Sequence, residues 1–189
     1  MKIAILGWGS LLWDRRADFD EQIGSWEFDG PKLKLEFSRI SQTRSGALTL
    51  VIDDQAGTPC PVAFAMSRRS SLDDAICDLR CREGTVHRRI GYLVRKGGEQ
   101  GSAQVPETVT DWLSEKDADA VVWTALKSNF KERKGVEFSI ENALRYIAEL
   151  PPEGKAAAAE YIWRAPDFVK TELRTAIEIE PWFVATRDE

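Results

Sequence analysis

The chain has 189 residues, enough for one domain with a substantial buried core. Its 26 lysines and arginines are outnumbered by 31 aspartates and glutamates, and the formal net charge of −5 excludes a general electrostatic attraction to nucleic acid. No stretch approaches the roughly 20 apolar residues of a membrane-spanning helix, and Met1 is not followed by the apolar run of a signal peptide. We therefore expect a cytoplasmic protein with neither a membrane nor nucleic acid among its partners.

The three cysteines, Cys60, Cys77 and Cys81, make an odd number, which argues against a disulfide framework and suits reducing surroundings. A structural zinc site would need all three together with His87, the single histidine, at a spacing that matches no usual zinc pattern. Buried free thiols are the simpler interpretation. We expect no metal ion.

The chain opens with a predicted strand and a glycine-rich loop. Ile3 to Leu6 form a continuous apolar run, which indicates a strand buried on both faces, and the run ends in Gly7, Gly9 and Ser10. Glycines leave backbone N–H groups uncovered by side chains, so a small anionic group can approach the main chain closely. Three interpretations stay open: a tight turn without a ligand, a dinucleotide-binding fingerprint, and a site for the carboxylate or amide of a small metabolite. The fingerprint lacks its third glycine, because Leu12 stands there.

Short strands are predicted next. The segment 14–30 is mixed and polar, and we interpret it as an irregular cover over a sheet. Beyond it, Leu33, Leu35 and Phe37 alternate with polar residues, which predicts a half-exposed strand, and two more strands are predicted over 47–52 and 61–67. This pattern indicates a largely antiparallel sheet that could close into a barrel.

A helix with both ends marked is predicted between Ser70 and Gly84. Ser70 followed by Asp73 resembles a capping box, and Gly84 suits the position just after a helix. Apolar residues recur with helical spacing on one side, and a rotation of about 100° per residue returns Glu83 to within roughly 20° of that side. An inward carboxylate needs a partner or a function. Glu83 is therefore interpreted as an ion-paired residue, as the end of a frayed helix, or as a proton-transferring group.

The rest of the chain predicts two more strands among helices. Alternation predicts a strand over 86–95, on which Tyr92 either gives its hydroxyl to a pocket or packs at a sheet edge. The remaining predictions are a short helix over 110–114, a strand over 120–126, a helix from Ser139 to the prolines at 151–152, helices over 154–163 and 168–177, and a tail with Trp182 and Phe183 that packs back. No repeat or linker interrupts the chain. We predict a single domain over 1–189, with a core over about 1–127 and a helical extension over about 128–189.

Two motifs together resemble the γ-glutamylcyclotransferase superfamily, and its glutathione-degrading ChaC-like branch most closely. Gly7 to Trp13, with the sequence Gly-Trp-Gly-Ser-Leu-Leu-Trp, looks like the Gly-Tyr-Gly-Ser-Leu-x-Trp loop of that branch. Arg82-Glu83 looks like its Arg-Glu pair at the end of a later helix. The intervening strands fit in order, so the resemblance covers roughly residues 1 to 95. Trp8 replaces the tyrosine of that loop. Ile90 occupies a position at which some members have a tyrosine, and Tyr92 on the same strand face could substitute for it.

The resemblance implies a fold, a reaction and a site. The implied fold is α+β, a small, mixed and mostly antiparallel β-barrel with surrounding helices, followed here by extra C-terminal helices. The implied reaction converts a γ-glutamyl peptide or amine to 5-oxoproline and the released amine, without a cofactor, by attack of the substrate's own α-amine on its γ-carbonyl. Glu83 would be the catalytic acid and base, and the substrate would be bound by Gly7, Trp8, Gly9, Ser10, Leu11 and Tyr92.

A second class of function stays open beside this enzyme. A non-catalytic metabolite-binding or interaction module could keep the same fold and use the loop only to hold a ligand. The expected partner is a small molecule in both cases, and a γ-glutamyl compound in the first.

Overall fold

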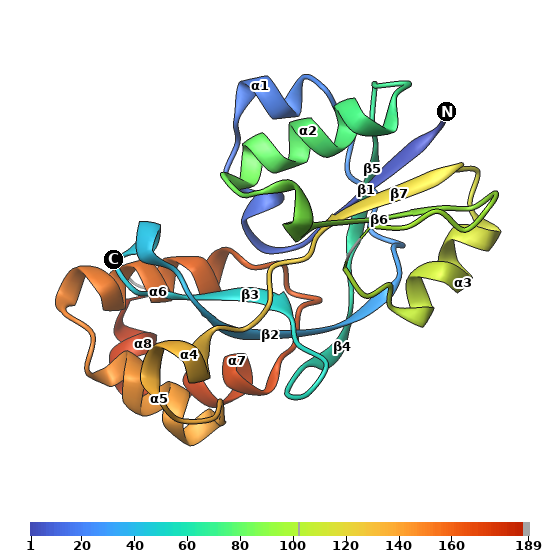
Figure 1. The fold of residues 1–189 in the computed structure, drawn as a ribbon. Coiled ribbons are helices and arrows are strands. Elements are labelled where there is room, and N and C mark those ends of the chain that lie inside the picture. The colour runs from blue at the N-terminus through green and yellow to red at the C-terminus, as the bar shows by residue number, and fades with distance from the viewer. Residues whose placement is uncertain (102, 187–189) are drawn as a thin grey trace. The chain divides into compact units, whose positions relative to one another are not determined.

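The computed structural model describes residues 1–101 and 103–186 (Figure 1). The chain divides into two compact units, of which the first comprises Met1–Leu33 with Pro61–Leu126 and the second Lys34–Cys60 with Lys127–Glu189. Each unit combines a β-sheet with helices, which confirms the predicted α+β class. That the whole chain forms one domain stays a prediction.

The first unit is built on a four-stranded sheet with the order β5-β1-β7-β6. Its strands are β1 (Ile3–Gly7), β5 (Ala63–Met66), β6 (Ile90–Val94) and β7 (Ala120–Thr124). β1 is antiparallel to β5 and parallel to β7, and β6 is antiparallel to β7. Every residue of β1 is buried, as the apolar run predicts for a strand covered on both faces. Because β1 and β7 are parallel neighbours, their carboxyl ends lie at the same edge of the sheet.

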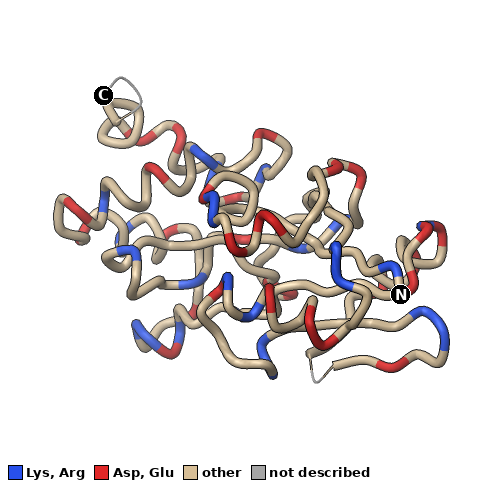
Figure 2. Tube along the Cα trace, turned by 90° about the horizontal axis from the view of Figure 1, so that it is seen from above, with Lys and Arg blue, Asp and Glu red and all other residues tan. Residues whose placement is uncertain are grey.

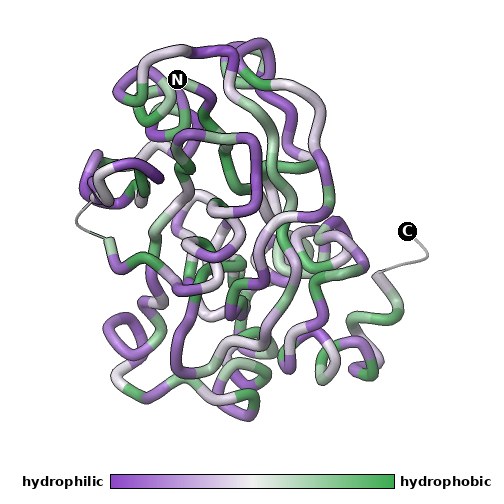
Figure 3. Tube along the Cα trace, turned by 90° about the vertical axis from the view of Figure 1, so that its right-hand side faces the viewer, coloured by the Kyte–Doolittle hydropathy of each residue, from purple (hydrophilic) through white to green (hydrophobic). Residues whose placement is uncertain are grey.

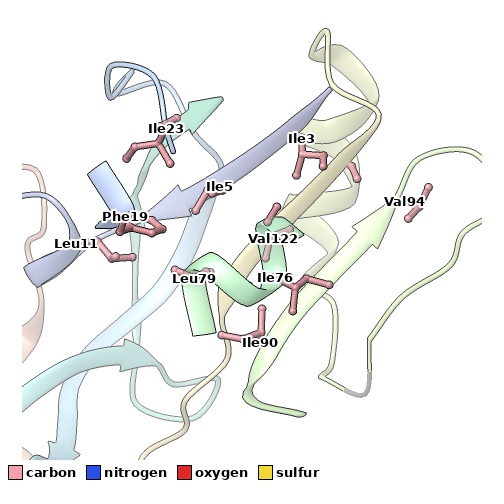
Figure 4. Close-up of a cluster of buried hydrophobic side chains, with 13 residues drawn as sticks. Ile3, Ile5, Leu11, Phe19, Ile23, Ile76, Leu79, Ile90, Val94 and Val122 are labelled. Carbon is pink, nitrogen blue, oxygen red and sulfur yellow. The ribbon is translucent and has the colours of Figure 1, made fainter. Parts of the chain in front are cut away.

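Helix α2 (Leu72–Glu83) packs against β7 and β6 and buries its apolar side there. In Figure 4, Leu11, Phe19 and Leu79 gather near the end of β1, whereas Ile3 and Val94 lie toward the other end of the sheet. The Asp74 N–H donates to Ser71 Oγ, so the helix starts one residue later than the predicted cap at Ser70. Gly84 ends the helix as predicted, in a left-handed conformation with a φ of +56°.

The remaining elements of the first unit are short. They are a 3-10 turn at Gly9–Leu11, α1 (Ala17–Asp20), a 3-10 turn at His87–Arg89 and α3 (Glu107–Glu115). The segment predicted as an irregular cover contains α1 and two isolated bridges, Ile23 with Ser67 and Glu27 with Phe64. Trp112 of α3 contacts the Phe64 ring of β5 edge-on, with ring centroids 5.0 Å apart.

The second unit carries a three-stranded sheet with the order β3-β2-β4 and most of the helices. Its elements are β2 (Lys32–Ile40), a 3-10 turn at Gln42–Arg44, β3 (Leu48–Ile52), β4 (Thr58–Pro61), α4 (Phe130–Lys134), α5 (Ile140–Ala148), α6 (Pro152–Arg164), α7 (Glu172–Ile177) and α8 (Pro181–Ala185). The predicted cap of α5 is confirmed, since the Asn142 N–H donates to Ser139 Oγ. The tail packs back as predicted: Phe183 is buried and its ring stacks on Trp163.

Two strand predictions differ from the structure. The strand predicted over 61–67 is split into β4 and β5 by Val62. The strand predicted to be half-exposed, β2, instead buries Glu36 and Ser38 completely. The described strands form two separate sheets, and no closed barrel is found among them, so the barrel stays an expectation of the resemblance.

Charge and hydropathy vary along the chain within each unit. Acidic and basic residues are interspersed along the traces of both units (Figure 2). Hydrophobic and hydrophilic segments alternate along the chain (Figure 3), as expected where each element turns one side to a core. Within the described residues, no helix is both long enough and apolar enough to cross a membrane.

Candidate functional site

The glycine-rich loop leaves β1 through three residues with distinct backbone requirements. Gly7 is the last residue of β1, and a Cβ built there would lie 2.5 Å from a ring carbon of Trp26. Trp8 is buried in an extended conformation. Gly9 has a φ of +58°, a left-handed conformation that favours glycine. Packing explains the first glycine, and backbone geometry explains the second.

The 3-10 turn at Gly9–Leu11 leaves donors without acceptors. The Leu12 N–H donates to the Gly9 carbonyl at 3.1 Å and the Asp14 N–H to the Ser10 carbonyl at 2.9 Å. Within the described part of the chain, the N–H groups of Gly9, Ser10 and Leu11 themselves donate to no backbone or side-chain acceptor. These three N–H groups form a short row of donors at the edge of the sheet where β1 ends.

Arg82, on the last turn of α2, holds this loop in place. Its Nη2 donates to the Ser10 carbonyl at 3.1 Å and to the Asp14 carbonyl at 2.8 Å. The Arg82 side chain is only 4% exposed, and the Asp14 carboxylate lies 3.7 Å from its Nη2. Burial lowers the pKa of the Arg82 guanidinium, and the negative charges of Glu83 and Asp14 oppose that shift. A buried cation therefore ties the end of α2 to the main chain of the loop.

Glu83, the predicted catalytic residue, is the last residue of α2 and is half-buried. Among the nearby charges, its negative charge contributes most to raising the pKa of the Arg82 guanidinium. The helical rotation predicts Glu83 as the inward residue, but the structure buries Arg82 more fully. Arg82 is the site residue that sequence reasoning about the helix missed, although the Arg-Glu pair contains it.

Tyr92, the predicted binding residue on β6, lies opposite Val122 of β7 and is half-buried. It packs against the same hydrophobic cluster as Ile90, on the side of the sheet that α2 covers. The Tyr92 carbonyl accepts the Gly101 N–H at 3.1 Å, so a second segment of chain runs along this strand. Its position fits packing in the sheet.

The structure thus brings the loop and the end of α2 together. The loop contributes backbone N–H donors at Gly9 to Leu11, and the helix contributes one buried guanidinium and one half-buried carboxylate. Donors of this kind stabilise a carboxylate or a developing oxyanion, and a neighbouring carboxylate can move a proton. The combination suits acyl chemistry on a small anionic substrate.

The interpretation of the cysteines as buried thiols is wrong for two of the three. Cys77 and Cys81 are exposed, and Nη2 of Arg80 lies 3.5 and 3.7 Å from their sulfur atoms. Cys60 of β4 is buried, and burial raises the pKa of its thiol. No cluster of three or more His, Cys, Asp or Glu side chains suited to a metal ion occurs among residues 1–101 and 103–186.

Comparison of the chain with protein-family models, with curated proteins and with solved structures finds no match. The geometry of the loop and of α2 is therefore the ground on which a function is proposed.

Proposed function

We propose that this chain is a γ-glutamylcyclotransferase-like enzyme that converts a γ-glutamyl peptide or amine to 5-oxoproline and the released amine. One observation carries the proposal: the buried guanidinium of Arg82 binds the Ser10 carbonyl, and so fixes a loop with three available N–H donors beside the carboxylate-bearing end of α2. The resemblance of both motifs to the ChaC-like branch agrees with it. The closed barrel and the cytoplasmic location belong to the same proposal.

In this reaction the substrate supplies its own nucleophile. The α-amine attacks the γ-carbonyl carbon, a C–N bond forms to close the five-membered ring, and the bond to the leaving amine breaks. Glu83 takes the proton that the attacking amine loses and returns it to the leaving nitrogen, so no cofactor is consumed. The enzyme mainly has to fold the substrate and hold it, which accounts for a site with few chemical groups.

The loop residues divide this work. The N–H groups of Gly9, Ser10 and Leu11 would bind a carboxylate or the oxyanion that develops on the γ-carbonyl. Gly7 lets β1 pass under the Trp26 ring, and Trp8 anchors the loop in the core. Tyr92 would shape the wall of the site from β6.

The test is the substitution Glu83→Gln, which removes the proton-transferring group and keeps its size. We expect release of 5-oxoproline to fall at least about 100-fold, the lower end of what a general acid–base group contributes. The substrates are glutathione, a γ-glutamyl dipeptide and a γ-glutamylamine, with 5-oxoproline quantified by mass spectrometry. Glu115→Gln, at an exposed position of α3, is the matched control and is expected to keep wild-type activity.

The outcomes separate the enzyme from its alternative. If wild-type protein releases no 5-oxoproline from any of the three substrates, the enzyme proposal is wrong. A binding module would instead show ligand-induced thermal stabilisation without turnover, and Glu83→Gln would be stabilised as much as wild type.

A further inference from the structure

Among the described residues of the first unit, the buried side-chain atoms without a hydrogen-bond partner include Arg82 Nε, Thr85 Oγ1 and Thr124 Oγ1. An unpaired buried donor or acceptor destabilises a fold, because it loses its water and gains nothing in return. Arg82 contacts the loop directly, Thr124 ends the strand beside β1, and Thr85 follows the end of α2 by two residues.

Thr124 is the last residue of β7, the parallel neighbour of β1. Ile5 of β1 lies beside Val122 of β7, and two residues further on these parallel strands end, in Gly7 and Thr124. Alternation along β7 puts Thr124 on the same face as Val122, whose side chain belongs to the cluster under α2. Thr124 is only 8% exposed. Its unpaired hydroxyl is therefore at the edge of the sheet from which the loop departs.

Arg82 and Thr85 approach this edge from α2. Arg82 reaches the loop at the Ser10 carbonyl, while its Nε–H has no acceptor. Thr85 follows Gly84, and its N–H closes the helix by donating to the Arg80 carbonyl at 3.1 Å. The main-chain N–H of Thr85 is thus paired, whereas its side-chain hydroxyl has no partner. β7 and the 3-10 turn that follows Thr85 both pack against α2.

All three groups can donate a hydrogen bond. The Nε–H of Arg82 can only donate, and both threonine hydroxyls can donate. With the positive charge of the guanidinium, the group is complementary to an anionic acceptor with two oxygens. The loop N–H row lies at the same edge of the sheet, so two donor sets are available to one ligand.

We propose that Thr124, with Arg82 Nε–H and Thr85 Oγ1, forms a carboxylate-binding subsite. This inference rests on the proposed function for the identity of the ligand: the carboxylate is the α-carboxylate of the glutamyl group. The N–H groups of Gly9 to Leu11 are then left to stabilise the oxyanion on the γ-carbonyl. Thr124 is a binding residue that sets specificity for substrates with a free α-carboxylate.

The experiment compares two ligands that differ only in the carboxylate, 5-oxoproline and 2-pyrrolidone. Wild-type protein should bind 5-oxoproline at least about 10-fold more tightly in NMR titrations. Thr124→Val removes the hydroxyl and keeps the shape of the side chain, and it should weaken 5-oxoproline binding about 10- to 100-fold while leaving 2-pyrrolidone unaffected. Thr124→Ser should keep the preference. Thr110→Val, at an exposed position of α3, is the matched control.

Thermal stability gives a second readout that a structural role would move in the opposite direction. Valine replaces an unpaired hydroxyl by a methyl group, so Thr124→Val should keep the melting temperature of ligand-free protein or raise it by up to about 3 °C. A variant that is at least as stable yet binds the carboxylate less well indicates a hydroxyl reserved for a ligand. A clear loss of stability would show a structural partner for Thr124 and overturn the proposal.

Binding and turnover keep the two proposals distinguishable. If 5-oxoproline binding depends on Thr124 but no γ-glutamyl substrate is converted, the subsite stands and the enzyme proposal fails. If wild type converts substrate and Thr124→Val has an unchanged KM, the enzyme stands and the subsite is wrong. Equal binding of 5-oxoproline and 2-pyrrolidone by wild type, or no binding of either, also overturns the subsite.

Discussion

At the scale of single residues, the two glycines of the loop are required for different reasons. The Gly-x-Gly pattern suggests a ligand that approaches the main chain, but the ring of Trp26 already occupies the space over Gly7. Gly9 is needed for its positive φ, which starts the turn whose N–H groups lack acceptors within the described residues. Of the two glycines, Gly9 therefore belongs to the proposed binding site through its backbone conformation, whereas Gly7 supports the loop through packing.

This difference predicts a coupling between Gly7 and Trp26. Gly7→Ala should lower the free energy of unfolding by about 1–3 kcal/mol, because the new methyl group overlaps a ring that packs on the core. In a Trp26→Leu background the same change should cost much less, since the smaller side chain leaves room. Chemical denaturation of the four proteins in this double-mutant cycle measures the coupling. Additive costs would contradict the packing explanation.

The site residues show where helical periodicity succeeds and where it fails. Counting from Leu72 puts Glu83 near the centre of the apolar side and Arg82 about 80° away, yet Arg82 is the more buried of the two. The count assumes that one flat surface covers the helix along its whole length. At its last turn, the segment between Ser10 and Asp14 lies over the flank instead, and an arginine is long enough to reach it.

Thr124 shows a second limit of sequence reasoning. A threonine at the end of an apolar run is simply a β-branched strand residue in a sequence pattern. Whether its hydroxyl finds a partner depends on segments more than forty positions away, such as the end of α2. The loop and the Arg-Glu pair could be found by motif, whereas the unpaired hydroxyls follow only from the three-dimensional structure.

At the scale of elements, β2 illustrates why alternation alone misplaces polar residues. The polar face predicted to be exposed is covered by α7: the Leu173 N–H donates to Glu36 Oε2 at 3.3 Å. The other face meets α6 through an edge-on contact of Phe37 with Tyr161. Alternation predicts the strand and which of its side chains share a face. It contains no information about a helix that packs on the polar face from more than 130 positions later.

Burial of Glu36 makes the second unit sensitive to pH. Desolvation raises the pKa of its carboxyl above the ordinary value of 4.5, and hydrogen bonds from the Phe37 N–H, Thr171 and the Leu173 N–H only partly offset that shift. The folded state therefore binds this proton more tightly than the unfolded state. The stability that Glu36 contributes is fully present below pH 4.5 and is lost as pH rises through the elevated pKa.

The expected outcome is a difference in slope between wild type and Glu36→Gln. From about pH 5 to pH 8 the free energy of unfolding of wild type should fall relative to that of the variant, by about 1.4 kcal/mol for each unit of elevation of the pKa. The variant should be less stable than wild type at pH 5, because a glutamine amide cannot accept both N–H groups that Glu36 accepts. Urea titrations at the two pH values measure this. Parallel pH profiles for both proteins would contradict a raised pKa.

Helices whose ends are marked by capping residues were predictable from the sequence, whereas the short helix α4 was not. α2 and α5 carry serine caps and apolar residues at helical spacing, and both form where the pattern puts them. α4 has five residues, with the sequence Phe-Lys-Glu-Arg-Lys, and only Phe130 is buried. A single apolar residue cannot show the helical periodicity from which a helix is predicted. Its position follows instead from Asn129 just before it, whose Oδ1 accepts the Ile40 N–H and whose Nδ2 donates to the Ile40 carbonyl.

At the scale of the whole molecule, the chain interleaves its two units. It passes from the first to the second after Leu33, returns after Cys60, and leaves again after Leu126. The sequence has no signal for this, because no composition shift or linker marks any of the three crossings. Each unit consequently has its sheet or its helices supplied by segments that are far apart along the chain.

Interleaving predicts how a truncated chain behaves. A fragment of residues 1–126 keeps the first unit complete but carries β2 and β3 without α4 to α8. Leu35, Phe37 and Leu48, fully buried in the intact protein, would lose partners such as Tyr161, and Ile40 would lose the Asn129 amide. Exposed apolar strands with unpaired edges associate with one another.

The fragment 1–126 should therefore bind a hydrophobic dye such as ANS and elute as aggregates in size-exclusion chromatography. The control is the same fragment with residues 34–60 replaced by a flexible Gly/Ser linker of about ten residues. This replacement removes the strands of the second unit and keeps every segment of the first unit. It should be monomeric and bind less dye, and it retains Arg82, Thr85 and Thr124 of the proposed carboxylate subsite. If the unmodified fragment is instead monomeric and unfolds as cooperatively as the full chain, the segment 34–60 does not depend on the C-terminal helices for its burial.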